Sequence, residues 1–131
     1  MSRLRHRLAT LAVIAIAVLA VAACGSSSGP AITKMDASSA VAALGSSVVI
    51  DVRTPSEFAA QHIKGAQNID VEAGDFGTRI ASLDKAGKYL VYCHSGRRSA
   101  IAAQQMASAG FKIIIDGGAM ADLIAAGAPA Q

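Results

Sequence analysis

Three short runs of apolar residues stand out along the chain, and each ends at a polar or reactive side chain. The runs are residues 48–50, 89–92 and 113–115, and they are followed by Asp51, Cys93 and Asp116. Because they show no polar alternation and are rich in β-branched and aromatic residues, they are typical of strands buried on both faces of a parallel sheet. Weaker strands are predicted at residues 66–69 and 32–33.

Helical segments are predicted between these strands. Thr54, Pro55 and Glu57 form a capping box with proline at the first helical position, so a short helix should begin there and run to about Gln61. The other helices are expected at residues 37–44 after Asp36, 76–83, 99–109 before Gly110, and 120–126 before Gly127. Strands that alternate with helices predict a small α/β domain with a parallel sheet.

The N-terminal residues have the pattern of an export signal. A basic segment at residues 1–7 precedes an apolar stretch at 8–22, which is shorter than the ~20 residues of a membrane-spanning helix. Small residues and then Cys24 follow, and the sequence Val-Ala-Ala-Cys resembles the lipobox of bacterial lipoproteins. In that class the cysteine becomes the mature N-terminus and carries lipid. The alternative is an ordinary signal peptide in which Cys24 stands by chance.

This interpretation divides the chain into a signal peptide at residues 1–23, a Ser/Gly-rich tether at 24–31 and a folded domain at 32–131. The mature protein is then expected outside the cytoplasm, facing the periplasm or the cell exterior, with lipid on Cys24 holding it to a membrane. Cys93 would be its one remaining thiol, so no internal disulfide is expected. A thiol kept in an oxidising compartment is either buried and inert or present for its chemistry.

The charge of the chain is unevenly distributed. There are 12 Lys and Arg against 9 Asp and Glu, a formal net charge of +3 over 131 residues. Arg3, Arg5 and Arg7 account for this excess, so the remaining nine bases balance the nine acids and no nucleic-acid partner is expected. A hydrophobic content of 53% excludes a disordered chain, and two cysteines exclude a disulfide-dense scaffold or a multi-cysteine metal domain.

The candidate chemistry is concentrated where the second apolar run ends. A strand end, a short loop and a helix start are predicted here in seven consecutive residues: Cys93, His94, Ser95, Gly96, Arg97, Arg98 and Ser99. Backbone N–H groups of such a loop, together with the N-terminal end of the helix, can surround an anion. They would favour the thiolate form of Cys93, and the two arginines would add positive charge.

This loop resembles the Cys-x-x-Gly-x-Arg-Ser active loop of the rhodanese homology domain. Two further parts of the chain resemble signatures of the same family, namely residues 51–58 with 62–66, and residues 116–118 with 127–129. The resemblance covers about residues 32–130. It implies a small three-layer α/β fold in which helices flank a central, mainly parallel five-stranded sheet.

The resemblance implies sulfur transfer. Cys93 would take the sulfane sulfur of a small anion such as thiosulfate, hold it as a persulfide and pass it to cyanide or a thiol. Residues 94–99 would bind the donor, with Arg98 matching the arginine of the family, while Asp51 and Arg53 would brace the loop. No cofactor and no metal are implied, and a monomer is expected.

Two alternatives remain open. A rhodanese-like module that carries sulfur or docks a partner without turnover would have the same motifs. A Cys-x5-Arg phosphatase or an arsenate reductase is more distant, because those loops place arginine six residues after the cysteine, whereas here Arg98 lies five residues on and the sixth position is Ser99.

Single residues also have ordinary structural interpretations. Cys93 could be a buried structural thiol, His94 a solvent-facing side chain, and His62 a packing and hydrogen-bonding residue. The sequence also departs from the family at Lys64, where proline is usual, and at residues 119–124, which lack the usual tryptophan. The second departure concerns one wall of the site and therefore substrate preference.

Overall fold

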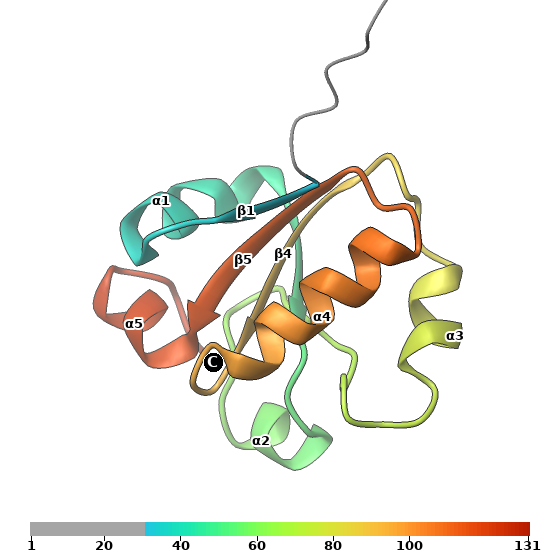
Figure 1. Cartoon of the computed structure of the whole chain (residues 1–131). Helices are drawn as coiled ribbons and strands as arrows, with labels where there is room; N and C mark the ends of the chain where they lie inside the picture. The colour runs from blue at the N-terminus through green and yellow to red at the C-terminus, as the bar shows by residue number, and fades with distance from the viewer. Residues whose placement is uncertain (1–30) are drawn as a thin grey trace, which may run out of the picture.

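Five strands form one sheet in which every neighbouring pair is parallel (Figure 1). The strands are β1 (Ile32–Lys34), β2 (Val48–Asp51), β3 (Gln67–Asn68), β4 (Lys88–Cys93) and β5 (Ile113–Ala119), in the spatial order β1-β5-β4-β2-β3. This computed structural model describes residues 31–131, so the predicted signal peptide, Cys24 and nearly all of the tether lie outside the described residues. The predicted α/β class with a parallel sheet is confirmed.

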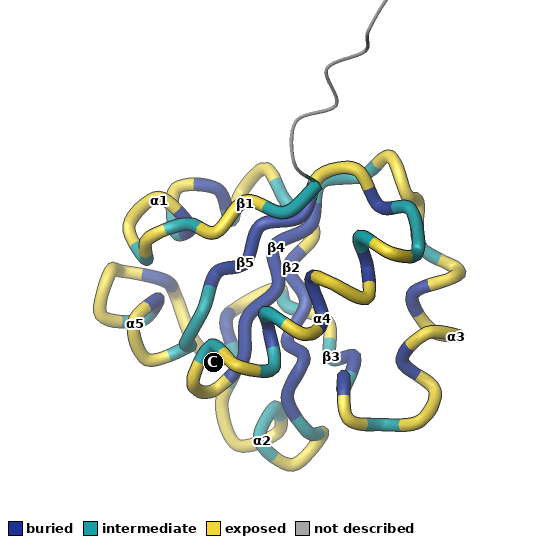
Figure 2. Tube along the Cα trace, in the orientation of Figure 1, coloured by how far each residue is buried: buried dark blue, intermediate teal, exposed yellow. Residues whose placement is uncertain are grey.

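Helices cover both faces of the sheet and leave its central strands buried (Figure 2). They are α1 (Ala37–Ala43), followed by a 3-10 turn η1 (Leu44–Ser46), α2 (Pro55–Ala60), α3 (Phe76–Ala81), α4 (Arg97–Ser108) and α5 (Met120–Ala125). Residues of α3 and α4 pack on one face, and residues of α1 and α5 pack on the other. Within residues 31–131, no helix has the length and apolar character needed to cross a membrane.

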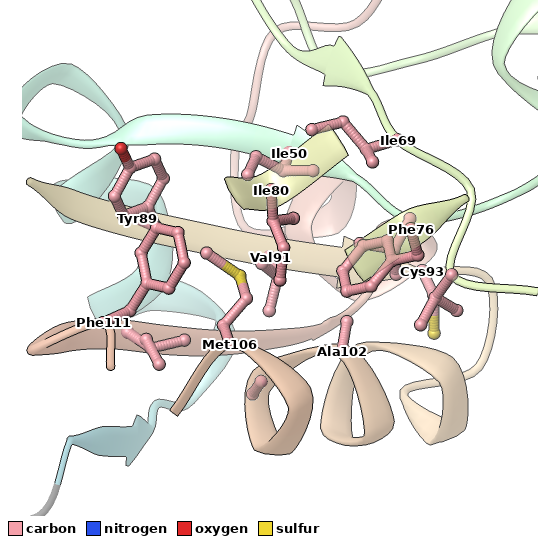
Figure 3. Close-up of a cluster of buried hydrophobic side chains, with 14 residues drawn as sticks. Ile50, Ile69, Phe76, Ile80, Tyr89, Val91, Cys93, Ala102, Met106 and Phe111 are labelled. Atoms are coloured by element: carbon pink, nitrogen blue, oxygen red, sulfur yellow. The ribbon is translucent and has the colours of Figure 1, made fainter. Parts of the chain in front are cut away.

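The alternation of side chains along β4 assigns its residues to the two faces. Tyr89, Val91 and Cys93 point toward α4, where Figure 3 shows them in one apolar cluster with Phe76 and other core residues. Leu90 and Tyr92 belong to the cluster under α1 and α5. Cys93 therefore shares its face of the sheet with α4, the helix that follows it in the chain.

Two of the predicted helix starts are present with their capping hydrogen bonds. The carboxylate of Asp36 accepts the N–H of Ser39 at 3.0 Å before α1. At α2 the hydroxyl of Thr54 accepts the N–H of Glu57 at 3.3 Å, and the Glu57 carboxylate accepts the N–H of Thr54 at 3.1 Å. Both orphan donors are thus satisfied, as the capping box predicts.

Two of the element boundaries that differ from the prediction shape the loop after β4. The helix expected from Ser99 begins at Arg97, because Gly96 takes up a left-handed conformation (φ +91°) and acts as its N-cap. The last strand does not stop at Ile115 but continues to Ala119, because β4 still offers it partners: Val91 pairs with Asp116, and Cys93 with Ala119.

A shift of register at the end of β5 supports the loop after β4. Between the pairs Val91–Asp116 and Cys93–Ala119, β5 advances by one more residue than β4. Gly118 lies here with φ +75°, and a Cβ atom on Gly96 would lie 3.7 Å from the Gly118 Cα. The loop therefore lies in van der Waals contact with the end of β5, and the positive φ at both positions favours glycine.

The C-terminal tail closes the fold against the segment after α2. Gln131 and His62 exchange two backbone hydrogen bonds of 2.9 Å, and the Lys64 N–H donates to the Pro129 carbonyl at 2.8 Å. His62 also stacks on Phe58, with ring centroids 3.7 Å apart, and its Nδ1 lies 2.8 Å from the Phe58 carbonyl oxygen. These contacts confirm the packing and hydrogen-bonding role predicted for His62.

Candidate active site

Cys93 lies at the carboxyl end of β4, the edge of a parallel sheet where ligand sites usually form. Cys93 is 0% exposed, and its side chain lies beside Phe76 in the cluster under α4 (Figure 3). The Gly96 N–H donates a hydrogen bond to the Cys93 Sγ at 3.0 Å. The sulfur thus lies at the base of the loop and faces a backbone donor.

Further N–H groups surround this donor. In the part of the chain that the structure describes, five backbone N–H groups of the loop and of the first turn of α4 have no protein acceptor: those of His94, Ser95, Arg97, Arg98 and Ser99. The first N–H groups of any helix lack intrahelical partners, and here the loop adds two more beside them. Because all of them follow the sulfur within one short turn, the arrangement suits an anion bound near Cys93.

Ser99 and Asp116 fix the loop to the sheet. The buried Ser99 hydroxyl lies 2.7 Å from the Asp116 Oδ1 and 3.0 Å from the Gly96 carbonyl oxygen. The same Asp116 oxygen accepts the Gly118 N–H at 3.1 Å, and Lys34 lies 3.4 Å from the other oxygen. The Ser99 hydroxyl is therefore occupied by the protein, whereas the Ser99 N–H has no protein acceptor within residues 31–131.

Arg98 forms a two-pronged ion pair with Glu57. Its Nη1 and Nη2 each lie 2.8 Å from a Glu57 carboxylate oxygen, and the Arg98 side chain is only 13% exposed. These hydrogen bonds lower the pKa of Glu57 to about 2 and raise the pKa of Arg98. Coulomb interactions with Glu57 and Glu72 also contribute to the raised pKa of Arg98.

Arg97 lies at the surface and faces a second carboxylate. Its Nη2 lies 3.4 Å from the Glu72 Oε1, and the other Glu72 oxygen lies 3.5 Å from Arg98. Both arginines were expected to add positive charge to the loop. In the structure each arginine faces a carboxylate. The reason is that β2 and β3 end at the same edge of the sheet as β4, so the segments that follow them begin beside the loop.

His94 and Ser95 form the exposed tip of the loop. Within residues 31–131, neither side chain has a hydrogen bond to the protein. In the same part of the chain, His, Cys, Asp and Glu side chains form no group of three that could hold a metal ion. The tip is therefore available to solvent and to a small molecule entering the loop.

Asp51 and Arg53 form a buried ion pair on the other face of the sheet. The Asp51 carboxylate accepts hydrogen bonds from Arg53 and from the Tyr92 hydroxyl, at 2.6 Å to Nη2 and 2.8 Å to the hydroxyl. Burial opposes the charged form of Arg53, but the hydrogen bonds and charge of Asp51 outweigh it and raise the arginine pKa. Burial also raises the pKa of Tyr92.

This pair braces a different segment from the one predicted. Arg53 donates to the Gln61 carbonyl at 2.6 Å, and the Tyr92 hydroxyl accepts the Ile63 N–H at 3.0 Å. Asp51 and Arg53 thus support residues 61–63, and they reach the loop only through Tyr92, the neighbour of Cys93. The reason is register: Asp51 pairs with Tyr92, whose side chain points away from the α4 face.

Three residues of the site were not singled out from the sequence. Glu57 was assigned to the capping box and to the signature at residues 51–58, Asp116 was assigned to a strand end and to the signature at residues 116–118, and Glu72 lies in no motif. Their proximity depends on the order of strands, which brings the ends of β2, β3, β4 and β5 to one edge. The positions of Glu57 and Asp116 within the family signatures were the available signals.

Comparison with known proteins identifies the family. A family model described as the Rhodanese-like domain matches residues 35–122, so the chain belongs to this family. The solved rhodanese-like domain of an Anabaena protein superposes with a TM-score of 0.67 at 26% identity, over 79% of this chain and 80% of that chain. The fold and the motifs of the loop thus agree with the family resemblance.

Two curated relatives show how far the similarity extends. A Bacillus subtilis protein with the name "Putative sulfur carrier protein YrkF" is 37% identical over 68 residues, 52% of this chain and 36% of that protein. The thiosulfate sulfurtransferase GlpE of Pseudomonas fluorescens is 42% identical over 74 residues, 54% of this chain and 65% of that protein. The matches thus span about one third of YrkF and just under two thirds of GlpE.

Proposed function

We propose that the chain is a sulfurtransferase in which Cys93 carries the transferred sulfur as a persulfide. The observation that carries this proposal is the contact of the Gly96 N–H with the Cys93 Sγ, at 3.0 Å, beneath a turn of further free N–H groups. Such donors stabilise negative charge on a thiolate and on the terminal sulfur of a persulfide. The name and 42% identity of GlpE support thiosulfate as a donor.

The reaction proceeds in two displacements at sulfur. The Cys93 thiolate attacks the outer sulfur of thiosulfate, the sulfur–sulfur bond of the donor breaks, and sulfite leaves with the bonding electron pair. Cyanide or a thiolate then attacks the terminal sulfur of the persulfide, and the Cys93 thiolate leaves. The cysteine is regenerated, and no external oxidant or reductant is consumed.

The test is the mass of the peptide that contains Cys93 after the full chain is incubated with thiosulfate. The wild-type chain should gain one sulfur atom on this peptide and lose it when cyanide is added, with formation of thiocyanate. Cys93→Ser should show neither effect, whereas Cys24→Ser, which removes the other thiol, should behave as wild type. Equal thiocyanate formation by Cys93→Ser would contradict the proposal.

A sulfur carrier is the second candidate function. The full burial of Cys93 favours it, because a buried sulfur suits storage and controlled release, and the name of YrkF points the same way. The same experiment separates the two functions. A persulfide that forms but releases no thiocyanate over many cycles would indicate a carrier, whereas sustained thiocyanate formation indicates an enzyme.

We also propose that the chain is exported and anchored by lipid on Cys24. The support is the sequence alone: a basic start, an apolar stretch at residues 8–22 and the Val-Ala-Ala-Cys site. In cells, Cys24→Ala should leave the chain unprocessed or release it from the membrane fraction, whereas the wild-type chain stays there. Unchanged processing and membrane association of this variant would contradict the lipid anchor.

A further inference from the structure

The positive charge at the start of α4 is matched by nearby acids. Arg97 and Arg98 bring two charges to the loop, and the carboxylates of Glu57 and Glu72 lie within 3.5 Å of them. A donor such as thiosulfate carries two negative charges and would need these same guanidinium groups. The acids and the donor therefore compete for the arginines.

The two acids are held very differently. Glu57 makes two contacts of 2.8 Å with Arg98 and also accepts the Thr54 N–H and hydroxyl, so it is fixed by the start of α2. Glu72 makes only long contacts of 3.4 and 3.5 Å, and its side chain is 52% exposed. Its partner Arg97 is 70% exposed. An entering anion can therefore displace Glu72 far more easily than Glu57.

We propose that Glu72 is a specificity-determining residue, whose carboxylate competes with anionic donors for Arg97 and Arg98 and so makes the loop discriminate by donor charge. This inference rests on the proposed sulfur transfer and names the donors that the site favours. Sulfane donors of low negative charge enter with a small electrostatic penalty. Dianionic donors must displace Glu72 or tolerate its charge close by.

The size of the effect follows from Coulomb interactions. In a water-like medium, one unit charge that lies several ångström from an entering monoanion changes the rate of its encounter with the loop by about threefold. Because the energy is proportional to the donor charge, the factor for a dianion is the square of this, about tenfold. Both factors should shrink at high ionic strength, since the groups involved are exposed.

The first test measures the charge of the loop without any sulfur transfer. The full chain is alkylated at low ionic strength with iodoacetate, which is an anion, or with iodoacetamide, which is neutral, and modification is quantified on the peptide that contains Cys93. In both reactions the thiolate displaces iodide. Glu72→Gln should raise the iodoacetate-to-iodoacetamide rate ratio about threefold over that of wild type.

Two control variants separate charge from shape. Glu72→Asp keeps the carboxylate and should stay close to the wild-type ratio. Asp75→Asn removes a negative charge from the same segment, but Asp75 makes no side-chain cap bond and pairs with neither arginine, so its ratio should also stay near wild type. A ratio in Glu72→Gln equal to that of wild type would overturn the proposal, as would an equal rise in Asp75→Asn.

The second test uses two donors that differ by one charge. Thiosulfate is a dianion and methanethiosulfonate is a monoanion, and each gives up its outer sulfur, with sulfite or methanesulfinate as the leaving group. Because the transfer is ping-pong, kcat/KM for the donor reports only the first displacement. Glu72→Gln should raise kcat/KM about tenfold for thiosulfate and about threefold for methanethiosulfonate.

The outcomes distinguish this inference from the proposed function. If the alkylation ratio rises but wild-type Cys93 gains no sulfur from either donor, the sulfurtransferase proposal fails while the electrostatic role of Glu72 is supported. If sulfur transfer proceeds but Glu72→Gln changes both donors by the same factor, the discrimination by charge is refuted and the sulfurtransferase proposal stands.

Discussion

At the residue scale, the Ser99 hydroxyl is the link between the loop and the sheet. Ser99→Ala should lower the free energy of unfolding by about 1–3 kcal/mol, because it leaves the buried Asp116 carboxylate with one hydrogen-bond donor fewer. Urea denaturation checks this loss. Persulfide formation on Cys93 should slow in the same variant, because Gly96 is less well held.

Ser95 provides the matched control for this prediction. Its side chain is exposed at the tip of the same loop, so Ser95→Ala should change the free energy of unfolding by less than about 0.5 kcal/mol. Equal losses in the two variants would show that the Ser99–Asp116 hydrogen bond contributes nothing particular to the fold.

The residues of the loop could be predicted from their spacing, but their partners could not. Cys93 and Gly96 lie three residues apart, at backbone positions whose roles follow from a strand, a turn and a helix start. Glu57 and Glu72 meet Arg98 only because β2, β3 and β4 end at the same edge of the sheet. Nothing in the local sequence around Glu72 indicates this meeting, and Glu57 already had a sufficient local explanation as a cap.

At the element scale, Glu57 joins the start of α2 to the start of α4. Hydrogen bonds from Arg98 lower its pKa from 4.5 to about 2, so the carboxylate stabilises the fold in its charged form. This contribution is complete above pH 4.5 and is lost as the pH falls from 4.5 to about 2, where the folded protein also takes up the proton. The free energy of unfolding of the wild-type chain should therefore decline across this interval.

Glu57→Gln should remove this part of the pH dependence. The variant should be less stable than wild type at neutral pH, and the difference between the two should shrink as the pH falls toward about 2. Asp36, whose pKa is also lowered, is common to both proteins and cancels in the comparison. Parallel urea titrations of the two chains check this, and a constant difference would contradict the ion pair.

Element boundaries were predictable where a side chain marks them. Thr54 and Asp36 mark the starts of α2 and α1 through their own hydrogen bonds. Helix α4 begins at Arg97, two residues before the predicted start at Ser99. A left-handed Gly96 ends the loop here without a side-chain cap, so no side chain marks this boundary in the sequence. The end of β5 was missed because its length depends on pairing with β4 rather than on its own composition.

At the scale of the whole molecule, the apolar runs were enough to predict a parallel sheet, but not the order of its strands. Placing β4 between β5 and β2 brings Cys93 to the middle of the carboxyl edge, with Asp116 on one side and Asp51 on the other. Local patterns carry no information on this order, and the family resemblance implied only five mainly parallel strands, so the order comes from the structure. The site is thus a property of the topology more than of any single motif.

The C-terminal tail gives a prediction at this same scale. It is hydrogen-bonded to residues 62–64, the segment in which the Ile63 N–H donates to the Tyr92 hydroxyl. Deletion of residues 129–131 removes three backbone hydrogen bonds, two between His62 and Gln131 and one between Lys64 and Pro129. At about 1 kcal/mol each, the free energy of unfolding should fall by about 3 kcal/mol.

Gln131→Ala keeps all three backbone bonds and loses only an exposed side-chain contact with His62, so it should cost less than about 0.5 kcal/mol. Hydrogen exchange should show loss of protection at the amides of His62 and Lys64 in the deletion but not in the substitution. If the two variants unfold alike, the stability of this region must come from the Asp51–Arg53–Tyr92 network alone.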